Sequence, residues 1–166
     1  MTTQLRTAID ATADALTADP GAARRQLTVT SRLVGPCAVE ARAGEHVVVI
    51  DQPAGLGEDR APNPAEYGLV ALAACQAQTY RFWAEKLGIA LDDVTVEVRG
   101  EVDVRRLFGV DGGRRAGFAR VEVAVYVRGP ADPGRYAALR EAADAHCPLL
   151  DTFAREVPVT TSVVVG

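Results

Sequence analysis

The side chains best suited to covalent chemistry in this 166-residue sequence are three cysteines, Cys37, Cys75 and Cys147. They are odd in number and form no CxxC pair, so neither the disulfide framework of a secreted domain nor a four-ligand zinc site fits them. The only histidines, His46 and His146, belong to no HExxH motif, and we expect no metal. In a reducing compartment, cysteines without a metal are either buried apolar side chains or reactive thiols.

The surroundings of the three cysteines in the sequence favour different roles. Cys147 precedes a proline, which predicts the N-cap of a short helix, where free amide groups favour a thiolate; alternatively, it only caps the helix. Cys75 lies within an alanine-rich helical segment and, taken alone, is expected to fill space. Cys37 follows a Gly-Pro turn and is expected to be structural. His146 adjoins Cys147 without a residue to orient it, so a Cys-His hydrolase is not favoured.

Hydrophobic periodicity predicts the elements that hold these residues. Apolar positions repeat at helical spacing over 5–16, 64–86 and 133–146, and a short fourth helix is expected between Cys147 and Pro158. Alternating patterns predict strands over 25–32, 37–43, 47–50, 92–106 and 117–128, with a glycine-rich hairpin turn at 110–113. A closing strand is expected over 159–165, after Pro158 ends the last helix. Because this order lacks regular βαβ alternation, we predict an α+β fold with antiparallel sheets.

The second helix is the element around which the others must be arranged. Asn63, Pro64 and Glu66 predict a capping box at its start, and Gly88 predicts its end. Its first half, residues 67–77, is apolar on nearly every face and should lie inside protein. A single chain of this length with short strands supplies little cover, so we expect a homodimer formed around this central buried helix.

Composition narrows the partners and the compartment. Hydrophobic residues make up 48% and charged residues 24%, which is typical of one globular domain. The net charge is −4 with scattered arginine pairs, so we expect no nucleic-acid partner. The longest apolar run, Leu69–Cys75, is too short to span a membrane, and residues 1–16 lack the features of a secretory signal. We therefore expect a cytoplasmic protein that makes no membrane contact.

Two motifs together resemble a known family. The segment APNPAEYGLVALAAC at 61–75, followed downstream by HCPLLDT at 146–152, resembles the OsmC/Ohr family of thiol-dependent peroxidases. The resemblance extends from about Arg25 to Val165. It divides the chain into an extra N-terminal helix in residues 1–24 and an OsmC-like domain in residues 25–166. It implies antiparallel sheets around a central helix and an intertwined homodimer.

The resemblance also implies a reaction in the oxidative stress response. Cys75 would reduce an organic hydroperoxide to an alcohol and become a sulfenic acid, and Cys147 would condense with it to form a disulfide. An external dithiol would then restore both thiols, with no cofactor. The apolar residues around Cys75 favour an alkyl hydroperoxide over hydrogen peroxide.

The sequence departs from the peroxidase branches at one position. Those branches place a glutamate directly after Asn-Pro, where this chain has Ala65, with Glu66 one residue later. Glu66 and Cys75 point to opposite sides of the helix, ~13 Å apart along it. Glu66 could therefore serve the site only through an arginine or a twofold partner, and otherwise it belongs to the capping box. This shift resembles OsmC-like branches of undefined function.

A buried thiol needs a nearby cation to ionise. Arg60, just before the motif, is a candidate beside Arg42 and Arg32, and the predicted catalytic set is therefore Cys75, Cys147, Arg60 and Glu66. The alternative function is a non-enzymatic OsmC-like dimer that binds a small apolar ligand near the aromatic residues Tyr67, Tyr80 and Trp83.

Overall fold

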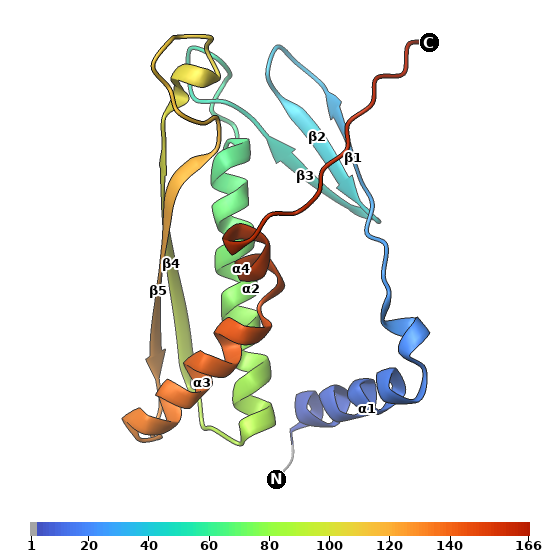
Figure 1. Ribbon diagram of the computed structural model, residues 1–166, viewed down its shortest axis with the longest axis vertical. Coiled ribbons are helices and arrows are strands. Elements are labelled where there is room, and N and C mark those ends of the chain that lie inside the picture. The colour runs from blue at the N-terminus through green and yellow to red at the C-terminus, as the bar shows by residue number, and fades with distance from the viewer. Residues whose placement is uncertain (1–2) are drawn as a thin grey trace.

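The computed structural model describes residues 3–166, and residues 1–2 of the predicted leading segment lie outside the described part (Figure 1). Four α-helices are present: α1 (Gln4–Ala18), α2 (Pro64–Leu87), α3 (Pro133–His146) and α4 (Pro148–Ala154). Five strands accompany them: β1 (Val29–Leu33), β2 (Val39–Ala43), β3 (His46–Ile50), β4 (Asp93–Val102) and β5 (Phe118–Arg128). Short 3₁₀ turns, η1 (Pro20–Ala23) and η2 (Val104–Arg106), precede β1 and follow β4.

The strands form two separate antiparallel sheets, which confirms the predicted α+β class. Strands β1, β2 and β3 form a meander in which Ser31 lies opposite Ala41, and Ala41 lies opposite Val48. Strands β4 and β5 form a hairpin. Helix α2 runs along this hairpin beside α3 and α4, whereas the meander stands apart near the other side of α2 (Figure 1).

Helix α2 begins and ends as the sequence predicts. The Asn63 side chain accepts hydrogen bonds from the backbone N–H groups of Ala65 (2.9 Å) and Glu66 (3.1 Å). In return, Glu66 Oε2 accepts from the Asn63 N–H at 2.8 Å, which completes the capping box. Gly88 ends the helix with φ of +61°, a left-handed conformation that glycine adopts without a steric penalty.

The hydrophobic core lies where α2, α3 and the β4–β5 hairpin meet. Its buried members are Tyr80, Ala84, Ile89, Leu91, Leu139 and Ala143. The strands of the β1–β3 meander contribute little to burial, because every residue of β1 is exposed and Ala41 is the only buried residue of β2. The hairpin side of the molecule is therefore packed, while the meander presents apolar surface to solvent.

The closing strand expected over 159–165 is wrong: these residues are extended, and Val163, Val164 and Val165 are each about 90% exposed. The first half of α2 is not enclosed by its own chain, since Val70 is 53% exposed, so its burial inside protein stays a prediction that depends on the expected dimer. In both places, apolar residues would need to contact surface that one chain does not provide.

A smaller difference concerns β4, which ends at Val102 and not at Arg106. The pairing shifts register between Glu101 and Val102, and Asp103 then caps the η2 turn by accepting from the Arg105 N–H at 3.1 Å. The irregular pairing and the capped turn end the strand at Val102, although the alternation of apolar residues continues to Val104 in the sequence. Of the helices within residues 3–166, none combines the length and the apolar character that crossing a membrane requires.

Candidate active site

The structure brings two of the three cysteines into contact. The Sγ atoms of Cys75 and Cys147 lie 3.4 Å apart, although 72 residues separate them in the chain. Cys75 is in the middle of α2 and half-buried, while Cys147, the residue that joins α3 to α4, is only 1% exposed. Both are free thiols, and their contact needs only a small further approach to become a disulfide at ~2 Å.

The proton affinity of Cys147 differs from the sequence expectation. Burial raises the pKa of its thiol, and the neighbouring Cys75 thiol raises it further. The Leu150 backbone N–H and the Thr79 hydroxyl act in the opposite direction on this pKa, but they do not offset burial. The prediction that the N-cap position alone would favour a thiolate is therefore wrong, because the same position is enclosed by protein.

Thr79 is a polar residue of the site that the sequence analysis did not identify. It lies one helical turn after Cys75, and its hydroxyl donates to the Cys75 carbonyl oxygen at 2.7 Å. This places the hydroxyl beside the Cys147 thiol, whose pKa it lowers. The i, i+4 spacing from Cys75 is the signal that could have revealed it.

His146 does not act on the neighbouring thiol. Its Nδ1 atom is 2.7 Å from the Ala142 carbonyl oxygen, and its ring stacks on Trp83 with centroids 4.1 Å apart. Lys86 Nζ lies 4.8 Å from the centroid of the same Trp83 ring. These contacts turn the imidazole toward the α2 surface, as expected for adjacent residues that diverge at a helix end.

The predicted activating arginine, Arg60, is held in the loop before α2. Its Nε atom donates to Asp51 Oδ2 at 3.4 Å and lies 3.2 Å from Glu58 Oε2. Asp51 is 1% exposed, and hydrogen bonds from backbone N–H groups, that of Gln52 first, lower its pKa although burial opposes them. Asp51 therefore anchors the loop 51–60, and Arg60 lies over this carboxylate, beside a cavity of about 300 Å³ that Cys37 also lines.

The remaining predicted residues also lie away from the thiol pair. Arg32 pairs with Glu40 at 3.8 Å across β1 and β2, and Arg42 is exposed on β2. Glu66 is the N3 residue of the capping box. Among the described residues, none of the three predicted arginines donates a hydrogen bond to Cys75.

A cavity of about 560 Å³ lies beside the residues that flank the thiol pair. Leu72, one turn before Cys75, and Leu150, three residues after Cys147, form part of its wall. The rest of the wall is mixed: it includes the apolar residues Phe118, Val121, Val123 and Phe153, together with Thr152 and the arginines Arg115, Arg120 and Arg155. No group of three metal-ligating side chains gathers anywhere in the described residues.

Comparison with known proteins agrees with this fold. The family described as OsmC-like protein matches residues 57–162. An OsmC-like protein from Mycoplasma pneumoniae has a similar structure, with a TM-score of 0.67 and 17% identity over 78% of this chain and 88% of that chain. An organic hydroperoxide resistance protein OsmC from Legionella pneumophila is also similar, with a TM-score of 0.57 and 22% identity over 78% of this chain and 89% of that chain.

A third similar structure is an OsmC-like protein of unknown function from Vibrio cholerae, with a TM-score of 0.60 and 11% identity over 78% and 94% of the two chains. No curated protein matches the sequence. The molecule is thus an α+β protein with antiparallel sheets and a pair of facing thiols. The chain belongs to the OsmC-like protein family.

Proposed function

We propose that this protein is a thiol peroxidase that reduces organic hydroperoxides to alcohols. The observation that carries the proposal is the 3.4 Å contact between the Sγ atoms of Cys75 and Cys147. Family membership supports it, because some structurally similar proteins are described as organic hydroperoxide resistance proteins. The apolar side chains in the wall of the nearby 560 Å³ cavity, Phe118, Val121 and Phe153 among them, suit an alkyl or aryl group, which is stabilised by leaving water.

The reaction uses the two thiols in order. The Cys75 thiolate attacks one oxygen of ROOH, the O–O bond breaks, and ROH leaves with a proton while Cys75 becomes a sulfenic acid. The Cys147 sulfur, already in contact, attacks this sulfenic sulfur and expels water, which leaves a Cys75–Cys147 disulfide. An external dithiol returns the two electrons and two protons. Cys75 is the first nucleophile because it is the more accessible of the two.

The functional unit that we propose is a homodimer. The accessible surface of the chain is 12,435 Å², whereas a compact monomer of this mass exposes about 7,900 Å². The excess is ample for an obligate dimer interface, which buries about 1,000 Å² or more on each subunit. The exposed apolar residues of β1, α2 and the tail 157–166 would then be covered, and a partner residue could supply the cation that Cys75 lacks.

Turnover of cumene hydroperoxide with a dithiol reductant tests the peroxidase. We expect C75S to lose turnover and C147S to lose the recycling step but to consume one equivalent of peroxide. C37S is the matched control, because Cys37 lies in a separate cavity, and it should keep full turnover. Equal turnover by C75S and the unsubstituted protein would contradict the proposal.

The second candidate is a non-enzymatic dimer that binds a small apolar ligand, and the same cavity favours it. Of the aromatic residues predicted to form that site, Tyr80 and Trp83 belong to the hydrophobic core cluster, while Tyr67 donates to the Val49 carbonyl oxygen at 2.7 Å. A ligand would instead contact Phe118 and Phe153. Saturable binding of a lipid probe, with all three thiols retained under micromolar peroxide, would select this function.

A further inference from the structure

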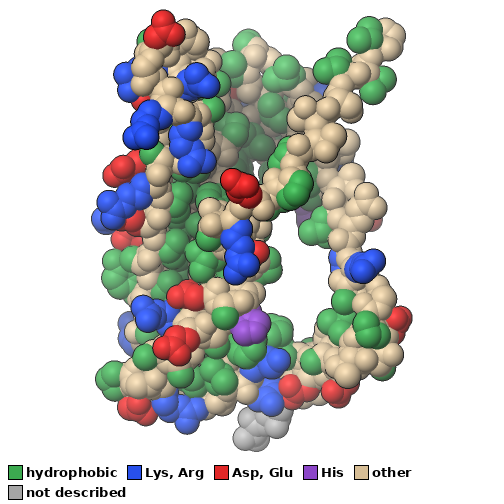
Figure 2. Space-filling model, viewed as in Figure 1, with side chains coloured by type: hydrophobic (Ala, Val, Ile, Leu, Met, Phe, Trp, Pro, Cys, Tyr) green, Lys and Arg blue, Asp and Glu red, His purple; other side chains and the backbone are tan. Residues whose placement is uncertain are grey.

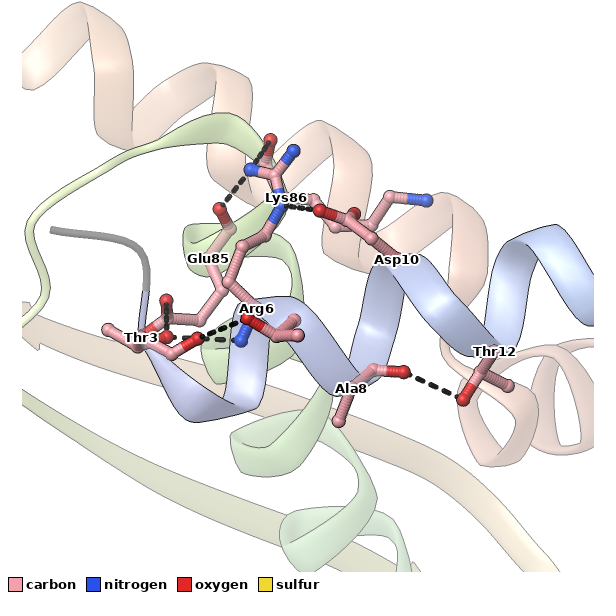
Figure 3. A network of polar contacts seen from close by, with 8 residues as sticks. Thr3, Arg6, Ala8, Asp10, Thr12, Glu85 and Lys86 are labelled. Atoms are coloured by element: carbon pink, nitrogen blue, oxygen red, sulfur yellow. Dashed lines mark hydrogen bonds and ion pairs between the residues drawn. The ribbon is translucent and has the colours of Figure 1, made fainter.

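Helix α1, which lies outside the matched residues 57–162, docks at the C-terminal end of α2 (Figure 3). Arg6 Nη1 donates to the carbonyl oxygens of Glu85 at 2.8 Å and Lys86 at 3.0 Å. The last carbonyl groups of a helix have few partners within it, and a positive charge is favourable at that end. Thr3 Oγ1 adds a hydrogen bond to Glu85 Oε2 at 2.6 Å.

The docking contact is small and local. Ile9, which is 4% exposed, is the one buried residue of α1. Asp10 Oδ2 accepts from Arg6 Nε at 2.6 Å and so orients the guanidinium toward α2. The other large apolar residues of α1, Leu5 and Leu16, are exposed. One polar cluster and one apolar side chain therefore attach this helix to the rest of the chain.

These contacts close the chain into a ring. The ring runs from α1 through the linker 24–28 and the β1–β3 meander into the loop 51–63, and returns along α2 (Figure 1). At the other end of α2, the ring is held by Tyr67 Oη on the Val49 carbonyl oxygen and by the Asp51 N–H on the Pro62 carbonyl oxygen, 3.3 Å away. Figure 2 shows an opening through the molecule between the linker arm and the α2–α4 side.

One side of this ring, formed by the linker 24–28 and β1 and called the arm below, carries apolar side chains that the chain leaves largely uncovered. Leu27 is 90% exposed, and Val29 and Leu33 are 61% and 65% exposed. The accessible surface of the chain also exceeds that of a compact monomer, as described above. Exposed apolar residues beside an opening indicate that another protein segment occupies it. A second copy of the same chain would cover both the apolar side chains of the arm and the excess accessible surface, so we take it as the occupant of the opening.

We propose that α1 is a clasp that closes the ring around a segment of the second copy, so that the subunits of the dimer separate only after α1 leaves α2. The inference rests on the dimer of the proposed function and adds a role for the helix that lies outside the family match. Because the clasp contacts its own chain, it slows the separation of subunits without forming the main interface.

Subunit exchange measures this role. Isotopically labelled and unlabelled dimers are mixed, and native mass spectrometry follows the dimer of intermediate mass. We expect the double variant Arg6→Ala/Ile9→Ala to exchange at least about a hundredfold faster than the unsubstituted protein, from about tenfold for each contact. Arg6→Lys, which keeps the charge but not the planar fork, should give an intermediate rate. Leu16→Ala, at an exposed position of the same helix, is the matched control and should exchange at the unsubstituted rate.

The possible outcomes distinguish a failure of the clasp proposal from a failure of the dimer proposal. A double variant that is folded by circular dichroism but monomeric, while Leu16→Ala remains a dimer, contradicts the clasp, because it would place α1 in the main interface. If the double variant exchanges as slowly as the unsubstituted dimer, or if Arg6→Lys and Leu16→Ala change the rate equally, the clasp is refuted and the dimer stands. An unsubstituted chain that is monomeric at micromolar concentration refutes the dimer, and the clasp with it.

Discussion

Replacing Thr79 by valine removes one hydroxyl beside the thiol pair while keeping the shape of the side chain. This hydroxyl donates to the Cys75 carbonyl oxygen at 2.7 Å and lowers the pKa of the Cys147 thiol. A hydrogen bond that favours a charged group contributes ~1.5 kcal/mol at the low end. The T79V substitution should therefore raise the pKa of Cys147 further.

The effect on rate is smaller than the effect on the pKa. The thiolate fraction of Cys147 falls near pH 7, but a thiolate of higher pKa is the better nucleophile, so only about half of the ~1.5 kcal/mol remains in the activation free energy. Condensation with the sulfenic acid at Cys75 should therefore slow by about threefold. The step is followed by oxidising the reduced protein with one equivalent of cumene hydroperoxide, quenching with acid and quantifying the disulfide by mass.

Two controls make this prediction specific to the hydroxyl. T79S keeps the donor and should condense at the unsubstituted rate, and T95V, at an exposed position of β4, should leave the rate unchanged. Condensation by T79V as fast as by the unsubstituted protein would refute the role of the Thr79 hydroxyl in lowering the pKa of Cys147. Slower condensation by T79S and T79V alike would point to side-chain packing as the cause.

Three further predictions follow from the same structure. Because burial raises the pKa of Cys147, condensation should accelerate about tenfold per pH unit from pH 7 to 8.5; a flat profile by the same quench assay would contradict a thiol that is protonated at neutral pH. N63A should lower the free energy of unfolding by ~1 kcal/mol in urea titrations, whereas E66Q, which can still bond to the Asn63 N–H, should cost less; equal losses would argue against the capping box. G100A should destabilise the fold by ~1–3 kcal/mol in the same titrations, because its Cβ would lie 2.6 Å from the Phe118 ring, and an unchanged midpoint would show that the hairpin yields easily.

The features that the sequence predicted well are local ones. The capping box of Asn63 and Glu66 and the end of α2 at Gly88 depend on residues within one helical turn, so their pattern is sufficient. The strands of the β1–β3 meander and of the β4–β5 hairpin follow from the alternation of neighbouring residues. The cysteine pair spans 72 residues, and it was found through the resemblance of two motifs and not through spacing.

The features that could not be predicted depend on what surrounds a residue. An N-cap position favours a thiolate, but only the folded chain shows that Cys147 is enclosed and that burial dominates its pKa. Arg60 precedes the motif in sequence, yet the buried carboxylate of Asp51 holds it in the loop. Residues 159–165 are rich in the β-branched valine and threonine typical of strands, but a strand also needs an edge to pair with, and no edge of the described residues pairs with them.

The most direct test of the thiol mechanism is to map the bond that forms after one equivalent of an organic hydroperoxide. Reduced protein should release one equivalent of alcohol per chain, and peptide mass mapping should find one disulfide, between Cys75 and Cys147, with Cys37 still free. Protein that keeps all three thiols, or that forms its bond through Cys37, would contradict the account.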